Sequence, residues 1–417
     1  MINKKLIDTF FINQKKAIKN NYPLLDNAFS KEDILEGVKV LLSGKITMSN
    51  KTLEFEKNFA KFVGAKYSLM VNSGSSANLL AVFASCNPKR NNKFKRGDEA
   101  IIPSLCWSTS LWPLVQAGLK PKFVDVDPKT LNMNLQQFKR AISSKTKLVM
   151  TVHVLGNSGP IDEISKICKR KKIILIEDTC ESLGALYKNK KLGTFGDFGT
   201  YSFYYSHQIT SGEGGMIVCN NFADYQLIHS MRSHGWSRGI KIDAYEKKKY
   251  QHLDNKFLFI NSGFNVRPLD ITASIANNQL KRINKFIKIR KENREKIIGK
   301  LKSSKFWDNQ FEFLKPSKNV SPSWFGLPML ISNKYLNNKK KFLKFLDKNN
   351  IENRPIISGN FLNQPCIDLY NFKYKKNNFV GSQAIEDRGF FIGLHTKKIS
   401  EKELDLLENK LMKISKF

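Results

Sequence analysis

Short apolar runs alternate with helical segments between residues 100 and 177, and this alternation restricts the fold more than any other feature of the sequence. We expect strands at 100–103, 122–125, 148–154 and 173–177, and helices at about 109–117, 135–142 and 161–171. Strands that are apolar throughout are buried on both faces, and parallel strands require a long crossover between them. The pattern therefore predicts an α/β fold with a mostly parallel central sheet.

Polar or aromatic side chains follow several of these strands. Trp107 and Asp178 each come shortly after an expected strand, His153 lies near the carboxyl end of another, and Glu181 lies three residues beyond Asp178. In open α/β sheets, ligands bind at the carboxyl ends of the strands. These residues are therefore candidates for one site, although a carboxylate at a turn, a packed tryptophan and a hydrogen-bonded core histidine remain alternatives.

A loop of small residues, 72–78, follows the apolar strand expected at 67–71 and precedes a helix expected at 79–84. Its residues Ser73, Gly74 and Ser75 would expose backbone N–H groups at the start of a helix. Such groups attract phosphate, because the helix dipole is positive there. A tight turn between strand and helix, without a ligand, is the alternative interpretation.

The stretch from Gly196 to Val218 reads as an aromatic strand, a glycine-rich turn and a second strand, with His207 near its centre. The region from Gly193 to Ile240 contains no lysine, although Lys and Arg together number 70 in the 417 residues. An imidazole can move protons near neutral pH without forming a covalent bond to a carbonyl group. A purely structural histidine is the alternative.

Composition excludes some classes of function. The net charge is +34, but the basic residues are spread along the chain, which favours a solvated basic surface over a nucleic-acid site. The six cysteines form no C-x-x-C pair and none lies at a metal-like spacing from a histidine, so we expect no metal site. The apolar residues between Leu6 and Ile12 are interrupted by polar ones, and no run approaches membrane-spanning length. We therefore expect a cytoplasmic protein without a membrane partner.

The carboxyl-terminal third has a different pattern. A long basic helix expected at about 281–302 leads to a strand at 324–331, a helix at 339–348, a strand at 354–357 and a helix at 401–414. These elements predict a smaller α+β unit. We place the large domain at residues 1–290 and the small domain at residues 291–417.

Taken in order from Ile46 to Gln279, these segments resemble the DegT/DnrJ/EryC1/StrS family of sugar-nucleotide aminotransferases, which have fold type I of the pyridoxal phosphate (PLP) enzymes. In that family a lysine at the position of His207 binds the cofactor as a Schiff base. The resemblance implies that Asp178 pairs with the pyridine nitrogen, that Trp107 stacks on the ring, and that Glu181 lies beside the cofactor. It also implies a phosphate site formed by Ser73, Gly74, Ser75 and Ser202.

Within that family, the sequence is most similar to the dehydratases of colitose synthesis that use pyridoxamine phosphate (PMP). The similarity lies in Phe203–His207, Cys106–Thr109 and Arg354–Phe361. It implies that His207 removes a proton at C4′ of the cofactor while the C3 hydroxyl of a nucleotide-linked 4-keto-6-deoxyhexose leaves. The implied substrate is GDP-4-keto-6-deoxymannose, the products are a 4-keto-3,6-dideoxy sugar and ammonia, and L-glutamate regenerates PMP.

The family resemblance also implies a homodimer with a shared active site. Asn265 and Arg267 match a segment that reaches the neighbouring subunit's cofactor phosphate or substrate, although helix capping and a surface ion pair are the alternative. His153 would line the other side of the cofactor ring or be a core residue. Between Ser233 and Leu280 there is no cysteine for the iron–sulfur cluster of related reductase-linked dehydrases. A lysine-free aminotransferase and a non-catalytic PLP-binding regulator remain alternatives.

Overall fold

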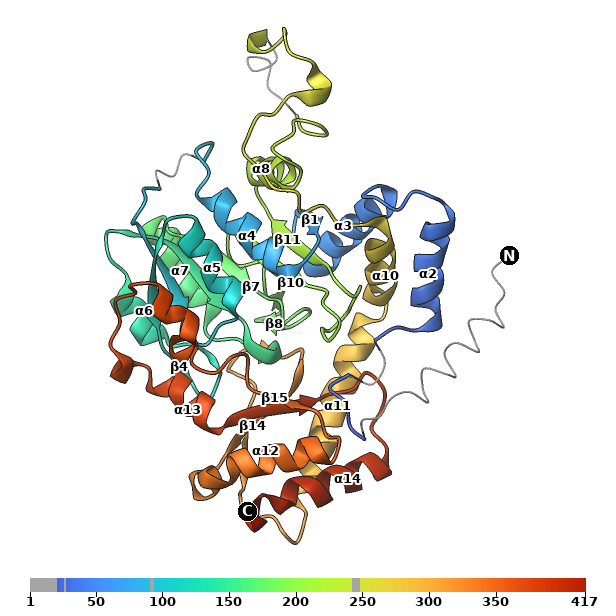
Figure 1. The fold of residues 1–417 in the computed structure, drawn as a ribbon, viewed down its shortest axis with the longest axis vertical. Helices are drawn as coiled ribbons and strands as arrows, with labels where there is room; N and C mark the ends of the chain where they lie inside the picture. Colours follow the sequence, from blue (N-terminus) through green and yellow to red (C-terminus); the bar gives the residue numbers. More distant parts are fainter. Residues whose placement is uncertain (1–20, 26–27, 91–93, 242–247) are drawn as a thin grey trace.

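The central sheet confirms the predicted architecture. The computed structural model describes residues 21–25, 28–90, 94–241 and 248–417. In this part of the chain, a seven-stranded sheet has the order β1-β11-β10-β7-β6-β2-β3 (Figure 1). Only β11 is antiparallel to its neighbours, and every other pairing is parallel. The strands are β1 (Tyr67–Val71), β2 (Glu99–Pro103), β3 (Lys120–Val124), β6 (Thr146–Val152), β7 (Ile174–Asp178), β10 (Phe198–Ser202) and β11 (Gly215–Cys219).

Helices cover both faces of this sheet, because both faces of its strands are apolar. In β7, Ile174 and Ile176 pack in the core that contains α4 and α5, whereas Leu175 packs with α6 and α7. Side chains two residues apart point to the same face of a strand. The helices of this domain are α2 (Lys31–Leu42), α3 (Asn50–Val63), α4 (Gly74–Ser85), α5 (Ser108–Gln116), α6 (Leu135–Ala141), α7 (Ile161–Lys171), α8 (Phe222–Arg232) and α10 (Asp270–Leu280).

The start of α4 differs from its prediction. The residues expected to form a loop, 74–78, are its first turns, and Ser73 is the N-cap, with its Oγ accepting a hydrogen bond of 3.0 Å from the Ser76 N–H. Glycine and serine are poor helix formers in peptides, which explains the prediction. At a helix start, however, serine is favoured because its hydroxyl accepts an otherwise unpaired N–H.

A second, four-stranded antiparallel sheet forms the lower part of the molecule (Figure 1). The predicted strand at 354–357 is wrong in length, because Ile357 has a φ of +51° and leaves the extended conformation. The sheet contains β12 (Phe311–Phe313), β14 (Gly326–Ile331), β16 (Gly389–Gly393) and β15 (Asn353–Arg354). Its helices are α12 (Lys339–Lys348), α13 (Val380–Arg388) and α14 (Glu401–Leu411).

The helix α11 (Ile283–Lys302) runs from the upper part of the molecule to the lower part (Figure 1). The predicted domain boundary at residue 290 falls inside this helix and stays a prediction. The apolar residues between Leu6 and Ile12 lie outside the described residues, and so does part of the polar stretch from Lys241 to Phe257. Among the described residues, no helix has the length and hydropathy needed to cross a membrane.

Asp125, directly after β3, connects the two sheets. Its carboxylate is 3% exposed and accepts hydrogen bonds from the backbone N–H groups of Gly381 and Ser382, at 2.6 and 2.8 Å. These groups belong to the first turn of α13, where helix N–H groups have no partner within the helix. A residue of the large sheet therefore caps a helix that packs on the small sheet.

We predict that D125A lowers the free energy of unfolding by about 1–2 kcal/mol, because it leaves the first N–H groups of α13 unpaired in a buried position. Urea unfolding followed by circular dichroism would measure the loss. The control is D368A at an exposed position, which should change stability by less than about 0.5 kcal/mol. Equal stability of the two variants would contradict a capping role for Asp125.

Candidate functional site

A cavity of about 630 Å³ lies between the carboxyl ends of the parallel strands and the small sheet. Most of the residues predicted from the sequence meet there. From the large domain it is lined by Ser73, Gly74, Ser75, Asn78, Trp107, Thr109, Val152, Asp178, Cys180, Glu181, Ser202, Tyr204, Tyr205, Ser206, His207 and Glu213. The remaining wall is formed by Leu24, Leu25, Phe325, Glu352, Arg354, Pro355, Ile357, Phe391 and Gly393.

Asp178 ends β7 and lies at the wall of the cavity with only 4% of its surface exposed. It follows Ile174 and Ile176 at a spacing of two residues, so it points to the face covered by α4 and α5. There Oδ2 accepts hydrogen bonds of 2.7 Å from Asn78 Nδ2 and from Ser110 Oγ. A buried carboxylate needs such partners, and these hydrogen bonds hold it in one orientation.

The amino-terminal end of α4 lines the cavity with Ser73, Gly74 and Ser75. Ser73 accepts from the N–H groups of Ser76 and Ala77, through Oγ and the carbonyl oxygen respectively. The N–H groups of Gly74 and Ser75 have no hydrogen-bond partner in the described part of the chain. Unpaired N–H groups and the positive end of a helix dipole suit a phosphate group.

Gly74 also permits a close approach of two elements. A Cβ atom at this position would lie 2.5 Å from Cβ of Ser202, on β10, and 3.1 Å from Sγ of Cys180. A larger residue would therefore push α4 away from the strand ends.

Trp107, the N-cap residue of α5, is 57% exposed and lines the same cavity. An exposed indole beside a cavity offers a flat apolar surface for a ring to stack on.

His207 lies in a turn after β10, where its N–H donates to the carbonyl oxygen of Tyr204 at 3.0 Å. Its ring packs edge-to-face against Phe325 of the small domain, with 5.2 Å between centroids. Nδ1 is buried and has no hydrogen-bond partner among the described residues. Burial, with a smaller effect of the positive charge of Arg290, lowers the pKa of His207 to about 4. The imidazole is therefore neutral at pH 7 and can accept a proton.

Glu181 differs from Asp178 in its electrostatic environment. Its Oε2 accepts a hydrogen bond of 2.9 Å from the Leu155 N–H, but burial raises the pKa of the carboxyl group to about 7. The negative charge of Asp178 raises it further. At neutral pH the protonated and ionised forms of Glu181 are both populated, so the group can donate or accept a hydrogen bond toward the cavity.

His153 is outside the cavity. It is 1% exposed, its Nε2 lies 3.0 Å from Oε2 of Glu177, and its Nδ1 lies 3.0 Å from Oγ of Ser158. Glu177 also accepts the backbone N–H groups of Gly193 and Gly196. Both ring nitrogens are thus occupied by protein groups. The geometry favours the core role that the sequence left open, and a role of His153 in substrate binding stays a prediction.

Asn265 and Arg267 are also outside the cavity of their own chain. Both are exposed, and Arg267 Nε donates to Asn265 Oδ1 at 3.1 Å. The neighbouring Val266 accepts the Asn72 N–H at 3.0 Å, which places this segment next to the start of α4. The single chain therefore presents the two side chains to its surroundings, and their role in a neighbouring subunit stays a prediction.

Sequence reasoning missed the two residues that orient Asp178. Asn78 and Ser110 are polar and buried, and both lie near the starts of their helices, α4 and α5. A buried polar side chain needs a hydrogen-bond partner. Two polar residues at buried helix positions were therefore the signal that could have identified them. Helix periodicity could not identify the partner, because Asn78 and Asp178 are 100 residues apart.

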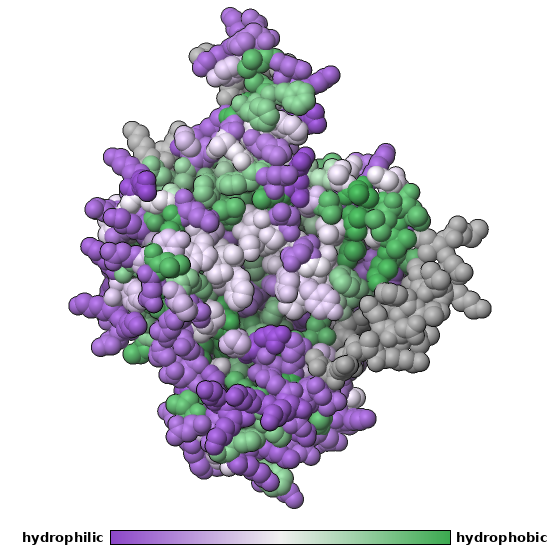
Figure 2. Space-filling model, viewed as in Figure 1, coloured by the Kyte–Doolittle hydropathy of each residue, from purple (hydrophilic) through white to green (hydrophobic). Residues whose placement is uncertain are grey.

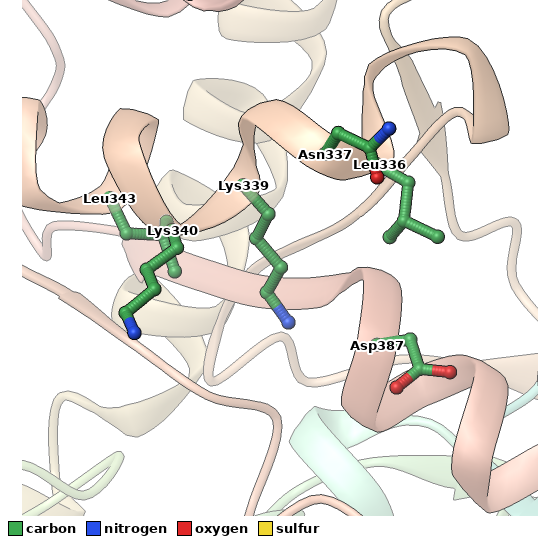
Figure 3. A pocket seen from close by; sticks show the side chains of 6 residues that line it. All are labelled: Leu336, Asn337, Lys339, Lys340, Leu343 and Asp387. Atoms are coloured by element: carbon green, nitrogen blue, oxygen red, sulfur yellow. The ribbon is translucent and has the colours of Figure 1, made fainter.

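A second hollow of about 400 Å³ lies on the small domain between α12 and the end of α13 (Figure 3). Leu336, Asn337, Lys339, Lys340, Leu343 and Asp387 line it. Nζ of Lys339 donates to the backbone carbonyl of Glu386 at 2.6 Å. None of the predicted site residues lies here, so the chemistry that the sequence predicts belongs to the larger cavity.

With this geometry in place, known proteins provide a comparison. The sequence model of the DegT/DnrJ/EryC1/StrS aminotransferase family matches residues 27–410. The chain belongs to this family. It is 38% identical over 393 residues to a GDP-4-keto-6-deoxy-D-mannose 3-dehydratase of Escherichia coli O55:H7, covering 94% of this chain and 99% of the relative.

Solved structures agree in fold. An E. coli GDP-4-keto-6-deoxy-D-mannose-3-dehydratase with bound hydrated PLP has a TM-score of 0.84 and 36% identity, over 94% of this chain and 99% of the other. A structure of this dehydratase with a trapped PLP-glutamate geminal diamine has the same TM-score and identity, over 94% of this chain and 100% of the other. The predicted PLP-enzyme fold is thus confirmed, whereas the role of each site residue stays a prediction.

We predict that the His207 imidazole titrates with a midpoint near pH 4 when followed by NMR of the histidine ring protons, with H207N used to assign its signal. An unfolded histidine titrates near pH 6.5. Between these values the unfolded chain binds a proton that the folded chain does not. The contribution of His207 to stability is therefore lost as the pH falls from about 6.5 to about 4. A midpoint at or above 6.5 would contradict the burial of this ring.

Proposed function

We propose that this protein is a PMP-dependent 3-dehydratase of a nucleotide-linked 4-keto-6-deoxyhexose, with GDP-4-keto-6-deoxymannose as its substrate. The products are the 4-keto-3,6-dideoxy sugar and ammonia, and L-glutamate becomes 2-oxoglutarate as PMP is regenerated. The reaction balances, because the sugar loses one oxygen atom at C3. L-glutamate gains one oxygen atom as it becomes 2-oxoglutarate and its nitrogen leaves as ammonia. The observation that carries the proposal is a PLP-family cavity that contains His207 and, among its described lining residues, no lysine.

The residues of the cavity fit the cofactor. The N–H groups of Gly74 and Ser75, with the hydroxyl group of Ser202, would hold the phosphate at the start of α4. The fixed carboxylate of Asp178 would face the pyridine nitrogen, and Trp107 would cover the ring. When bound, the cofactor supplies an amine that condenses with the sugar ketone and a protonated ring that withdraws electrons. The negative charge of Asp178 would keep that ring protonated.

His207 would carry the proton transfers. Its imidazole lines the cavity and is neutral at pH 7, so it can remove a proton at C4′ and then deliver a proton to the departing C3 hydroxyl group. Phe325 holds the ring in place without competing for its nitrogens, because a phenyl group offers no hydrogen bond of comparable strength. Glu181, with a pKa of about 7, can exchange a hydrogen bond with the cofactor's phenolic oxygen or amine.

The shared active site predicted from the sequence is consistent with an exposed apolar patch. Figure 2 shows apolar side chains gathered over α2 and its neighbouring helices. The exposed residues there include Leu41, Leu42, Ile46, Leu53 and Leu269. Apolar patches of this kind mark interfaces. We propose that a second copy of the chain covers this patch, that Asn265 and Arg267 then complete the partner's site, and that the dimer works in the cytoplasm in dideoxy-sugar synthesis.

We predict that H207K binds PLP covalently and loses dehydration by at least about 100-fold, because an amine captures the aldehyde and no longer shuttles protons freely. Borohydride reduction followed by peptide mass spectrometry would locate the attachment at position 207. H207N is the matched control, which should lose dehydration without covalent capture. Borohydride fixation of PLP to a lysine of the wild-type protein would contradict the proposed site.

The products separate the proposal from its alternatives. With PLP, L-glutamate and the keto sugar, we expect ammonia and a dideoxy sugar in equal amounts, measured by an ammonia assay and by mass spectrometry of the nucleotide sugar. An amino sugar as the sole product would identify a lysine-free aminotransferase. A protein that is silent in both assays, but whose binding to another protein changes with PLP, would instead be a regulator.

A further inference from the structure

One wall of the cavity is largely apolar, in contrast to the hydroxyl, amide and carboxyl groups at the ends of the parallel strands. Its apolar residues come from the small sheet and from the segment at 21–25, and they include Leu24, Leu25, Phe325, Phe391 and Gly393. A polar group buried against such a wall loses its hydrogen bonds to water without replacing them. The wall therefore favours an apolar part of a ligand.

This wall reaches His207 through a series of ring contacts. Phe325 packs edge-to-face against His207, with 5.2 Å between centroids, and the ring of Phe391 lies 6.0 Å from that of Phe325. Phe391 and Gly393 are two residues apart on β16, so they face the same side of the small sheet. The wall is therefore continuous from the imidazole to the end of β16.

The amino-terminal segment extends the wall beyond Gly393. A Cβ atom at Gly393 would lie 2.7 Å from the carbonyl oxygen of Pro23, so the lack of a side chain there admits the segment. Tyr22 is 1% exposed, and its hydroxyl group donates to the carbonyl oxygen of Gly393 at 3.2 Å. These contacts hold the backbone on the small sheet. Leu24 and Leu25, which follow directly, therefore have a defined place in the wall.

The chain is held again on the large domain, close to His207. The ring of Phe29 packs against that of Tyr205, two residues before His207, with 6.1 Å between centroids. The carbonyl oxygen of Ala28 accepts a hydrogen bond of 2.8 Å from Nε2 of Gln279. Along the chain, the two leucines thus lie between contacts with the small sheet and contacts with the turn that carries the histidine.

Few groups of the proposed ligands are apolar. The cofactor ring is assigned to Trp107, and two phosphate groups separate the nucleobase from the hexose. The hexose has a single apolar group, the methyl carbon C6, which is bound to C5 and lies two bonds from C4, where the cofactor amine condenses. C3 and C5 flank C4, so a sugar whose C3 hydroxyl group faces His207 also has its methyl group near this residue. The apolar wall beside His207 is therefore the surface that the methyl group meets.

We propose that Leu24 and Leu25 form a subsite for the C6 methyl group and select 6-deoxy sugars over 6-hydroxy sugars, which rests on the proposed function. The leucine side chains offer no hydrogen bond to a hydroxyl group at C6, so that group would lose water without gaining a partner. An apolar pocket discriminates against an added hydroxyl group by a factor on the order of 100. The subsite thus sets a preference without any charged group.

The test compares GDP-mannose with its 6-deoxy analogue, which differ only at C6 and lack the ketone that would react. Isothermal titration calorimetry measures the binding of each to the PLP-loaded protein. We expect wild type to bind the 6-deoxy analogue about 10- to 100-fold more tightly. In L24N/L25N this ratio should fall below about threefold, because the amide groups can bond to the hydroxyl group. L24M/L25M keeps an apolar surface and should retain the ratio within about twofold.

Two controls separate selection from a general loss of the site. GDP alone, which has no hexose, should bind wild type and both double variants within about twofold of each other. L369N makes the matched change at a leucine that is 80% exposed, and it should leave the ratio unchanged. An unchanged ratio in L24N/L25N would overturn the proposal, as would equal binding of the two sugars by wild type. Loss of GDP binding in L24N/L25N would assign the leucines a structural role instead.

A separate assay of dideoxy-sugar formation distinguishes this proposal from the function on which it rests. A wild type that prefers the 6-deoxy analogue but forms no dideoxy sugar would support the subsite and overturn the dehydratase. A wild type that dehydrates the keto sugar but binds the two analogues equally would overturn the subsite alone. Binding of neither GDP sugar would overturn the GDP-linked substrate and the subsite together.

Discussion

The hydrogen bonds that Asp178 accepts from Asn78 and Ser110 hold the whole site together. Each joins a different helix to the end of β7, so the start of α4, the start of α5 and the carboxylate have one fixed arrangement. Loss of either donor would leave a buried charge with fewer partners, which is costly in a region of low polarity. The positions of the N–H groups at the start of α4 and of the exposed face of Trp107 depend on this arrangement.

The other half of the site depends on how the small domain is placed. Phe325 supplies the apolar surface against His207, and Arg354 supplies the positive charge. Both come from the small sheet, whose position is set by α11 and by the cap that Asp125 provides for α13. A histidine in this turn without that cover would be solvated, and its pKa would stay near its ordinary value. Domain packing therefore determines the chemistry of His207.

Much of the fold could be predicted because it follows from local periodicity. The strands β1 and β7 and the helices α7 and α12 are near their expected positions, since their apolar patterns and flanking residues leave few alternatives. The predictions were wrong where tertiary contacts outweighed the local conformational preference of a residue. Gly74 and Ser75 begin a helix rather than a loop, because Ser73 caps it and Ser202 leaves no space for a side chain. Ile357 leaves the strand region altogether.

The sequence by itself determined which chemical groups are present: an imidazole in the turn after β10, a carboxylate at the end of β7, and small residues after β1. These are properties of residue type and order. Only the tertiary structure decided which groups share the cavity. It brought Asn78 to Asp178, placed Arg354 and His207 in one cavity, and gave both ring nitrogens of His153 protein partners. Contacts between distant residues and the loss of solvent around a group arise from packing, and a local pattern contains neither.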